Sequence, residues 1–365
     1  MLFGGDTVNT CFNCGNCTAI CPLSRDSTVF PRNMVRYLQL GLKEKLLESC
    51  DPWLCYYCGQ CSKTCPRQAH PGELMMASRR FLISQYDWTG LSKRLYVSKA
   101  WELGALLVVA LFVVGLFVFS GSFAEERMVA TTVSLNTFAP VEWVHYGDLT
   151  LAAVLGVLLS SNGYRMCRFI MRGEKGLAIP LRLYIQELNT LILHGLTQIR
   201  WRECEKPTRW LKHLLLVTGY GTMFILVVLL LPWFQRDTSE FNWLSLLGYY
   251  ATFVLLYTTG DSMISRFRQR EEIHKHSHMT DWMFLILLFL TALTGILLHL
   301  FRLMNLPLPT YYMYVVHLAI AVPMLVVEVP FSKWAHLMYR PLAIYLVSVK
   351  ERAKELSRCV PVTAS

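Results

Sequence analysis

The chain has 365 residues, 54% of them hydrophobic, and its 35 Lys and Arg against 25 Asp and Glu give a formal net charge of +10. This length allows two or three domains. All but three of the basic residues lie in four stretches, 1–100, 163–212, 262–280 and 333–365, which alternate with hydrophobic runs. That distribution excludes nucleic-acid binding as the reason for the positive charge and instead indicates loops on the cytoplasmic side of a membrane.

The first 65 residues contain eight cysteines in two sets of four with identical spacing. Each set reads Cys-x2-Cys-x2-Cys-x3-Cys-Pro, so the fourth cysteine directly precedes a proline. Three thiolates on one tight loop hold three irons of a [4Fe–4S] cube, and the cysteine before proline reaches the neighbouring cube. The spacing therefore predicts two clusters. The first is bound by Cys11, Cys14, Cys17 and Cys65, and the second by Cys55, Cys58, Cys61 and Cys21.

Two other uses of these cysteines fit poorly. Structural zinc sites use pairs of thiols or thiol–imidazole mixtures and have no place for a third cysteine at the same spacing. Disulfides need an oxidising compartment, and nothing at the N-terminus resembles a secretory signal peptide. Four cysteines lie outside the pattern, and we expect them to be small buried hydrophobes or idle thiols: Cys50, Cys167, Cys204 and Cys359.

The segments around the second cysteine set have helical periodicity and no strand alternation. Apolar residues at helical spacing predict one helix over residues 31–48, with Pro31 in a first-turn position, and another over residues 73–85. We therefore predict a cytoplasmic helical ferredoxin domain over residues 1–95. The basic stretch at its end is expected to lie against anionic lipid headgroups.

Six hydrophobic runs follow, most of them close to the ~20 residues that a helix needs to cross a bilayer. They cover residues 101–120, 144–164, 211–234, 243–259, 281–300 and 312–331, of which 243–259 is the shortest. Because the basic stretches fall on one side, we expect a multi-pass protein of the inner (cytoplasmic) membrane, with both termini in the cytoplasm. Residues 181–199 are apolar but interrupted by charged side chains, and they predict an amphipathic helix at the cytoplasmic interface.

These elements together predict an all-α fold. A two-cluster ferredoxin domain precedes a six-helix transmembrane haem-binding bundle over residues 96–345, and residues 346–365 form a cytoplasmic tail. Lipid is therefore an expected partner, whereas nucleic acid is not.

Five histidines lie in or at the edges of the hydrophobic runs, where such side chains are costly and usually functional. His213 and His336 fall on the cytoplasmic side, and His145, His299 and His317 on the outer side. Two neutral imidazoles facing each other across a helix bundle can hold a b-type haem. The positions predict one inner haem and a second, outer haem. The alternative is that these histidines are interfacial hydrogen-bonding groups.

The ligand pairs follow from depth. His213 with His336 is the predicted inner pair. His317 is the expected outer ligand, with His299 on the adjoining run favoured narrowly as its partner and His145 as the alternative. Between His317 and His336, Pro323 and Pro330 can break the helix and rotate one end.

Other ionisable residues have weaker signals. Glu102, Asp261 and Glu328 are close to lipid and are candidates for quinone protonation, or else helix-terminal and snorkelling groups. We expect three histidines of a basic loop to face solvent, namely His274, His276 and His278. A metal site formed by them is the alternative. We expect His70 and His194 to be structural.

Several of these motifs resemble known families. Residues 11–85, including Trp53-Leu54-Cys55, resemble the C subunit of heterodisulfide reductase. The last hydrophobic run, with the segment from Pro330 to His336, resembles the final helix of the cytochrome b (gamma) subunit of respiratory nitrate reductase. In that family the helix matching residues 211–234 carries two histidines. Here His213 matches the inner one, and Met223 stands where the outer one would be.

The chain as a whole, with residues 194–204 and 330–340, is similar to the membrane-embedded C subunit of quinone-interacting membrane-bound oxidoreductases. These come from sulfate-reducing and sulfur-oxidising prokaryotes. The resemblance implies two b haems, two cubanes and a quinone substrate. It also implies flavin- and Fe–S-containing partners resembling the flavoprotein (A) subunit of heterodisulfide reductase, and electron exchange with adenylylsulfate reductase.

The predicted function is electron transfer between the quinone pool and soluble partners. We find no nucleophile–base pair and no dinucleotide fingerprint in the sequence, so any other reaction is expected in a partner protein. Three alternatives share these cofactors: a membrane subunit of a heterodisulfide reductase, of a sulfite reductase, or of a dicarboxylate dehydrogenase. A transporter with a regulatory iron–sulfur domain is a further alternative, but it predicts broken, repeated helices that the runs do not show.

Overall fold

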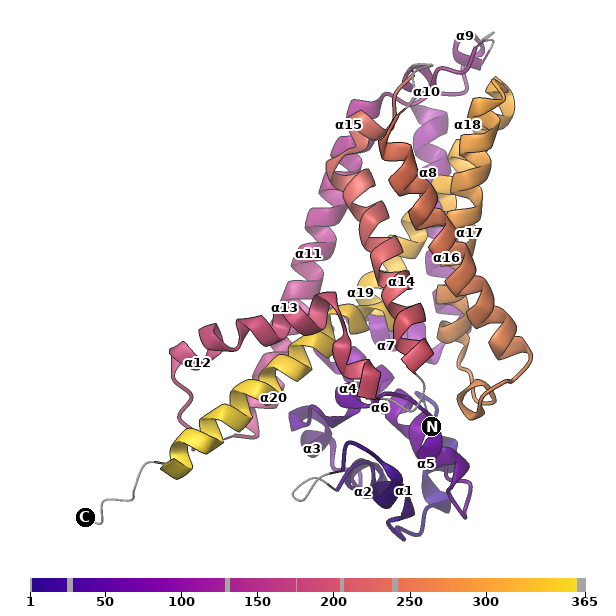
Figure 1. Ribbon diagram of the computed structural model, residues 1–365. Helices are drawn as coiled ribbons and strands as arrows, with labels where there is room; N and C mark the ends of the chain where they lie inside the picture. The colour runs from indigo at the N-terminus through magenta and orange to yellow at the C-terminus, as the bar shows by residue number, and fades with distance from the viewer. Residues whose placement is uncertain are drawn as a thin grey trace.

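The fold is all-helical, as the sequence predicts. The computed structural model describes residues 2–24, 29–128, 132–174, 176–203, 207–237 and 242–359. Long helices form an upright bundle, the N-terminal domain lies beneath one end of it, and three further helices extend sideways at that same end (Figure 1).

Short helices build the N-terminal domain. They are η1 (Asp6–Thr10), α1 (Asn16–Ile20), α2 (Arg32–Gln39), α3 (Lys43–Glu48), α4 (Asp51–Leu54), α5 (Gln60–Lys63), α6 (Pro71–Tyr86) and α7 (Leu91–Val97). The helix predicted over residues 73–85 is present as α6, which begins with Pro71 in its first turn. The single helix predicted over residues 31–48 is wrong. Gly41 adopts a φ of 64° between α2 and α3, and this left-handed conformation ends the first helix.

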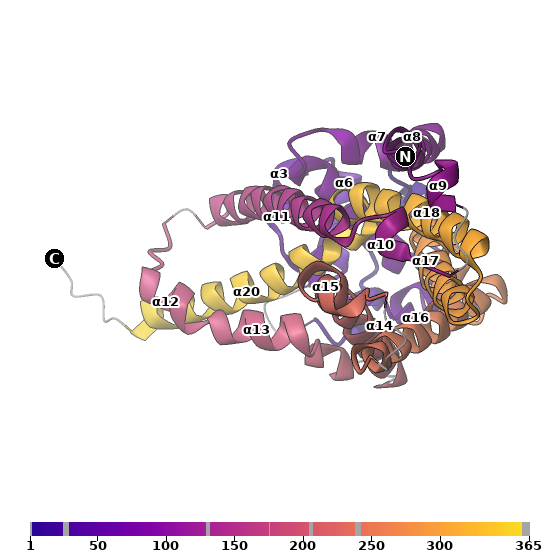
Figure 2. The same ribbon diagram turned by 90° about the horizontal axis from the view of Figure 1, so that it is seen from above.

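Six long helices form the bundle: α8 (Lys99–Phe119), α11 (Val141–Arg172), α14 (Pro207–Phe224), α16 (Leu244–Phe267), α17 (Met279–Leu303) and α18 (Pro307–Pro323). Smaller elements connect them: α9 (Glu125–Met128), α10 (Leu135–Phe138), η3 (Ile225–Leu229), α15 (Leu231–Phe234) and η4 (Glu272–His274). Figure 2 shows these helices surrounding a common centre when the bundle is seen from above.

In the described part of the chain, five helices are long and apolar enough to cross a membrane: Lys99–Phe119, Val141–Arg172, Pro207–Leu229, Met279–Leu303 and Pro307–Phe331. The remaining predicted span, residues 243–259, lies in α16, which has 24 residues but is not among these five. Helix α16 packs between α14 and α17 and leaves Phe253 70% exposed on its outer face. Helix α16 is thus part of the bundle and presents an apolar side chain on its outer face, as the neighbouring helices do. These helices are compatible with a membrane protein.

The chain is broken after α18, as Pro323 and Pro330 predict. A π-helical segment η5 (Met324–Glu328), α19 (Val329–Phe331) and η6 (Lys333–Ala335) lead into α20 (His336–Cys359). Because proline lacks the backbone N–H, the regular ladder cannot continue through these positions. Residues 346–359 therefore belong to a long helix, while residues 360–365 of the predicted tail lie outside the described residues.

The interfacial segment also differs in detail from its prediction. Residues 181–199 form two helices, α12 (Leu181–Gln186) and α13 (Leu188–Leu196), followed by η2 (Ile199–Glu203). Both α12 and α13 pack along α20, and the three lie across the axis of the bundle (Figures 1 and 2). This orientation fits the predicted position at a membrane surface.

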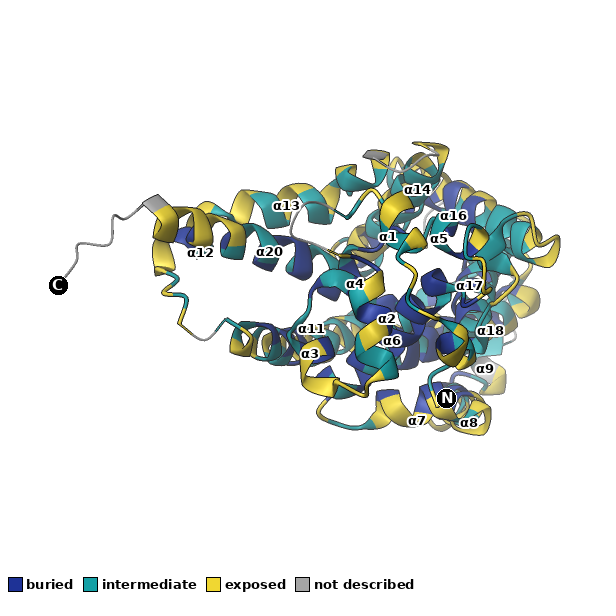
Figure 3. Ribbon diagram, turned by 90° about the horizontal axis from the view of Figure 1, so that it is seen from below, coloured by how far each residue is buried: buried dark blue, intermediate teal, exposed yellow. Residues whose placement is uncertain are grey.

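One apolar core joins the N-terminal domain to the bundle. Trp53 and Tyr86 are fully buried together with Ile170 of α11 and Tyr339 of α20. The ring of Trp53 lies 5.2 Å from that of Tyr339, measured between centroids. Seen from below, buried residues continue from α4 and α6 into the neighbouring helices (Figure 3). The N-terminal domain is thus held against the bundle by a shared core.

Candidate redox centres

The two cysteine loops repeat in backbone conformation as well as in sequence. Asn13 and Tyr57, at equivalent positions, have φ of 66° and 53°, and Gly15 and Gly59 have φ of 89° and 83°. These left-handed residues fold each loop back toward its own thiols. The backbone N–H of Asn13 donates to Cys11 Sγ at 3.4 Å, and that of Tyr57 donates to Cys55 Sγ at 3.3 Å. Such N–H groups stabilise cluster-bound sulfur.

The thiols of the two loops lie in two neighbouring groups. Burial raises the pKa of Cys17, and the neighbouring thiols of Cys11, Cys14 and Cys65 raise it further. One cavity is lined by all four cysteines of the second group, Cys21, Cys55, Cys58 and Cys61. Its wall also includes four apolar residues: Ile20, Leu23, Phe30 and Met75. Four thiols around one largely apolar cavity fit the ligand set of a [4Fe–4S] cube.

The two groups differ in exposure. Cys14 is exposed in the first group, whereas Cys55 of the second is only 7% exposed. The second loop is pressed against the bundle, since the carbonyl oxygen of Cys58 accepts a hydrogen bond from Arg209 of α14 at 3.4 Å. The first group therefore lies toward the surface and the second toward the bundle.

Comparison with known proteins agrees with this geometry. Residues 7–69 match the family model of the 4Fe-4S dicluster domain. The N-terminal region is a dicluster iron–sulfur domain. It is homologous to the C subunit of heterodisulfide reductase.

Three relatives illustrate this homology. A protein of Archaeoglobus profundus that is named as similar to the heterodisulfide reductase C subunit is 37% identical over 84 residues, which are 23% of this chain and 45% of the relative. The iron-sulfur C subunit of CoB–CoM heterodisulfide reductase from Methanopyrus kandleri is 31% identical over 28% of this chain and 49% of the relative. The C subunit of H2:CoB-CoM heterodisulfide,ferredoxin reductase from Methanothermobacter marburgensis is 33% identical over 21% and 41%.

The similarity is confined to part of each protein. The chain spans less than half the length of these three relatives. No solved structure matches the chain. The dicluster domain is thus shown by homology, whereas the bundle must be interpreted from its own residues.

The predicted inner histidine pair is brought together by α14 and the start of α20. The ring centroids of His213 and His336 lie 6.3 Å apart. Metal–imidazole bonds are about 2 Å long, so two imidazoles on opposite sides of one metal have centroids roughly 6 Å apart. His336 Nδ1 donates to the Lys333 carbonyl oxygen at 2.6 Å, which leaves Nε2 as the ligand atom. The spacing and the tautomer both fit a pair of imidazoles bound to one metal ion.

The protonation states also suit metal binding. Burial lowers the pKa of His336 to about 4, helped by the nearby cations Lys333, Arg79 and Arg340. This imidazole is therefore neutral at pH 7, as an axial ligand must be. His213 Nδ1 is buried without a hydrogen-bond partner, an uncommon situation for a ring nitrogen inside a protein.

A continuous series of contacts connects the second cysteine loop with this pair. The Arg340 guanidinium lies 5.9 Å from the ring of Tyr56, beside Cys55, and 4.7 Å from the ring of Trp201. Trp201 in turn lies 4.5 Å from the ring of His213. Neither Arg340 nor Trp201 was predicted as a site residue. Both fall within the runs that resemble the quinone-linked family, and that was the signal in the sequence that could have identified them.

The predicted outer ligand, His317, faces α17. Its Nδ1 lies 2.9 Å from Thr294 Oγ1, which donates its own proton to the Leu290 carbonyl oxygen at 2.7 Å. The Thr294 oxygen therefore accepts from Nδ1–H, and Nε2 of His317 keeps a free lone pair. A Cβ at Gly295 would lie 3.3 Å from the His317 ring, so glycine makes room for it.

The structure separates the two possible partners of His317. His299 Nε2 lies 2.7 Å from the Tyr249 hydroxyl of α16. His145 Nδ1 is buried without a hydrogen-bond partner. The neighbours of both candidates, Val144 and Leu298, pack in one apolar cluster with Tyr314 and Leu318 on either side of His317. Tyr249 therefore engages His299, whereas His145 keeps an unpartnered ring nitrogen and is the less engaged of the two candidates. Met223 packs in an apolar cluster instead.

Two of the three acidic candidates form a pair. Glu102 of α8 is 1% exposed and Glu328 is 0% exposed, and their carboxyl groups meet beside Ser332. Two carboxylates have no donor between them, so they can hydrogen-bond only if one carboxyl is protonated. Asp261, by contrast, is neutralised by Lys212 at 2.6 Å and Arg270 at 3.7 Å. Sequence reasoning found the acids but had no means of pairing them.

The loop histidines are more varied than predicted. His276 is exposed, but His274 and His278 are half-buried, which corrects the expectation that all three face solvent. His278 caps α17, because its Nδ1 accepts from the backbone N–H of Thr280 at 3.3 Å. Of the remaining cysteines, Cys50 is 4% exposed, as expected of a buried hydrophobe, and Cys204 lies outside the described residues.

Proposed function

We propose that this chain is the membrane electron-transfer subunit of a quinone-linked oxidoreductase. In this proposal it exchanges electrons between a membrane quinone and soluble flavin- and Fe–S-containing subunits, with adenylylsulfate reductase as the family-implied terminal partner. Two [4Fe–4S] clusters and b-type haem, when bound, supply one-electron chemistry. The eight motif cysteines hold the clusters, His213 and His336 hold an inner haem, and His317 with His145 holds an outer one.

The observation that carries the proposal is the contact series from Cys55 to His213. Tyr56, Arg340 and Trp201 fill the space between the second cluster loop and the histidine pair. A metal-binding loop and a pair of neutral imidazoles that share such contacts belong to one redox unit. A transporter with a separate regulatory domain does not require this arrangement.

The exposed end of the unit favours a soluble partner at the first cysteine loop. Cys14 is exposed, and the neighbouring Phe12 is 60% exposed. A partner that covers this loop would approach the first group of thiols closely. The fully buried Trp53 and Tyr86 keep the second loop fixed beneath the bundle.

A second candidate function is supported by the homology. All three relatives carry names that place them with the C subunits of heterodisulfide reductases. The same cofactors would serve a membrane subunit of such a complex. Copurification distinguishes the two functions, because the proteins that bind the chain determine its terminal substrate.

Dithionite-minus-oxidised spectra of the purified chain test the main proposal. We expect a reducible b-type haem signal together with low-temperature electron paramagnetic resonance from two cubanes. A quinol analogue should reduce the same haem signal. If the full chain carries iron–sulfur clusters but no dithionite-reducible haem, the quinone-linked proposal is wrong and the homology to heterodisulfide reductase is untouched.

The carboxyl pair gives a prediction for proton transfer. We infer that Glu102 and Glu328 accept a proton when quinol is oxidised, since a positioned base contributes about 10²- to 10⁴-fold to such steps. Glu328→Gln should keep the fold, because its amide donates to Glu102, but should slow haem reduction by quinol at least about tenfold. Stopped-flow absorbance measures this rate. Asp261→Asn is the matched control, and an equal loss in both variants would contradict the assignment.

A further inference from the structure

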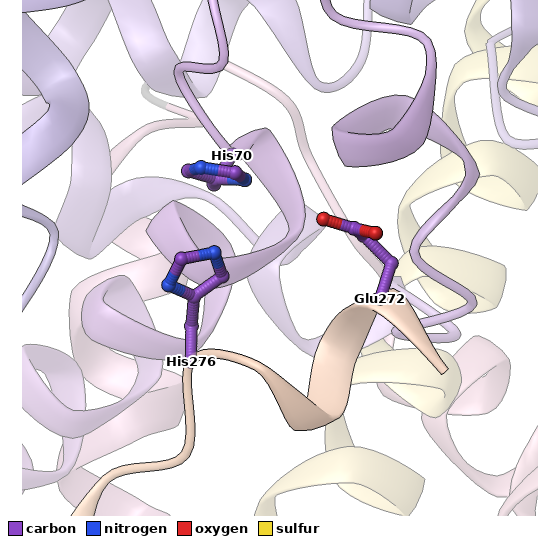
Figure 4. Close-up of side chains that lie close together, drawn as sticks. All are labelled: His70, Glu272 and His276. Carbon is purple, nitrogen blue, oxygen red and sulfur yellow. The ribbon is translucent and has the colours of Figure 1, made fainter. Parts of the chain in front are cut away.

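A second group of metal-binding side chains lies where the N-terminal domain meets the loop between α16 and α17. His70 precedes α6, whereas Glu272 and His276 lie in and just after η4. One ligand atom from each residue can be chosen so that all three lie within 4.8 Å of one another. Figure 4 shows both imidazoles and the carboxylate directed toward a common space, with the two parts of the chain on opposite sides.

The backbone holds His70 in an unusual conformation. This residue has a φ of 43° and ψ of 60°, in the left-handed region that non-glycine residues rarely occupy. Such residues cluster at functional sites, where the surrounding structure maintains them. Its Nδ1 is buried and has no hydrogen-bond partner. The conformation therefore places a ring with an unsatisfied nitrogen opposite the loop.

The imidazoles of His70 and His276 lie close together, with ring centroids 4.0 Å apart. Tetrahedral zinc holds two imidazoles with their centroids roughly 5 Å apart, so the two rings must separate by about 1 Å when the ion binds. Neutral imidazole is the form that binds metal, and the unpartnered Nδ1 of His70 is a free ligand atom.

We propose that His70, Glu272 and His276 bind one divalent first-row metal ion, with Zn²⁺ as the best fit. Two imidazoles and one carboxylate are a common ligand set for zinc, with a fourth position left for water. The three ligands include no cysteine, so this site is chemically separate from the cubanes. It is also independent of the proposed quinone-linked function.

One side chain competes for the site. Lys275 Nζ lies 2.7 Å from Glu272 Oε2 and is 49% exposed. Exposed pairs of this kind contribute little, about 0–1 kcal/mol, so a metal ion can displace the ammonium group. This ion pair holds the Glu272 carboxylate near the two rings.

The site would fasten the loop against the second cysteine motif. The Tyr57 hydroxyl donates to Glu73 Oε2 at 2.7 Å and its oxygen lies 3.3 Å from the Ile273 carbonyl oxygen, so the loop already contacts a residue between Cys55 and Cys58. A Cβ at Gly59 would lie 2.9 Å from Ile273 Cγ2, which shows how closely the two segments approach. Metal ligation on both sides of this junction links the N-terminal domain to the bundle.

Metal analysis of the full-length protein in detergent tests the proposal. The protein is purified anaerobically with its iron, dialysed against a mild chelator, and titrated with ZnCl2. Total zinc and iron are then measured by mass spectrometry. We expect about one zinc per chain with total iron per chain unchanged by the titration. His276→Ala and Glu272→Gln should each lower zinc affinity at least about tenfold without loss of iron.

His274→Ala is the matched control, because this histidine lies in the same loop but outside the ligand set, and it should bind zinc as the unmodified chain does. Zinc-edge X-ray absorption provides a second measurement, with only nitrogen and oxygen neighbours expected. A sulfur shell would mean that zinc occupies cysteine sites. That result, or unchanged zinc binding in His276→Ala, would overturn the proposal.

Discussion

Cys58→Ala is expected to remove one cubane and to leave the other in place. Cys58 lines the cavity of the second group, and a thiolate lost from a four-ligand set cannot be replaced by alanine. Non-haem iron per chain should fall from about eight to about four. Electron paramagnetic resonance should show a single remaining cluster. Because the second loop contacts the bundle, reduction of the remaining cluster by quinol should also be lost.

The cross-over of ligands can be tested with the same measurement. Cys21 belongs to the first motif in sequence but lines the cavity of the second group, so Cys21→Ala should remove the same cluster as Cys58→Ala. Cys65→Ala should instead give the spectrum of Cys14→Ala. Cys167→Ser serves as the control, since this thiol lies outside both groups. If Cys21→Ala behaves like Cys14→Ala, each motif holds its own cluster and the assignment is wrong.

His336→Ala is expected to abolish the inner haem. The variant removes the imidazole whose Nδ1 bonds to the Lys333 carbonyl oxygen, and it leaves His213 without the ring that lies 6.3 Å away. Haem per chain, measured by pyridine haemochrome absorbance, should fall by about half in a chain that carries two haems. Both cubanes should be retained, because the cysteine loops do not use this side chain. Full haem content in the variant would contradict the pairing.

The outer pair is tested by two further variants in the same assay. His145→Ala should remove the outer haem, whereas His299→Ala should retain it, because His299 is engaged by Tyr249. The sequence favoured the reverse, since His299 lies on the run next to His317. Depth in the membrane can be read from a sequence, but the rotation of each helix about its axis cannot. That rotation depends on side chains packed from other helices.

The cluster motifs show which features can be predicted locally. The first three cysteines of each motif lie within seven residues of chain, so their spacing alone restricts the geometry of the loop. The family match over residues 7–69 agrees with this prediction. The hydrophobic runs are also local features, and five of them form helices able to cross a membrane. The break at Gly41 was missed because apolar spacing continues across it, although the backbone does not.

By itself, the amino-acid sequence determined that this protein has a dicluster iron–sulfur domain and a helical, lipid-compatible body. These properties depend on ligand spacing and on continuous hydrophobicity along a short stretch of chain. Only the tertiary structure decided that Glu102 meets Glu328, that Trp201 and Arg340 join a cysteine loop to His213, and that His70 faces His276. Each of these contacts joins residues far apart in the chain, and they form only when the helices have packed at defined rotations and the N-terminal domain has docked beneath them.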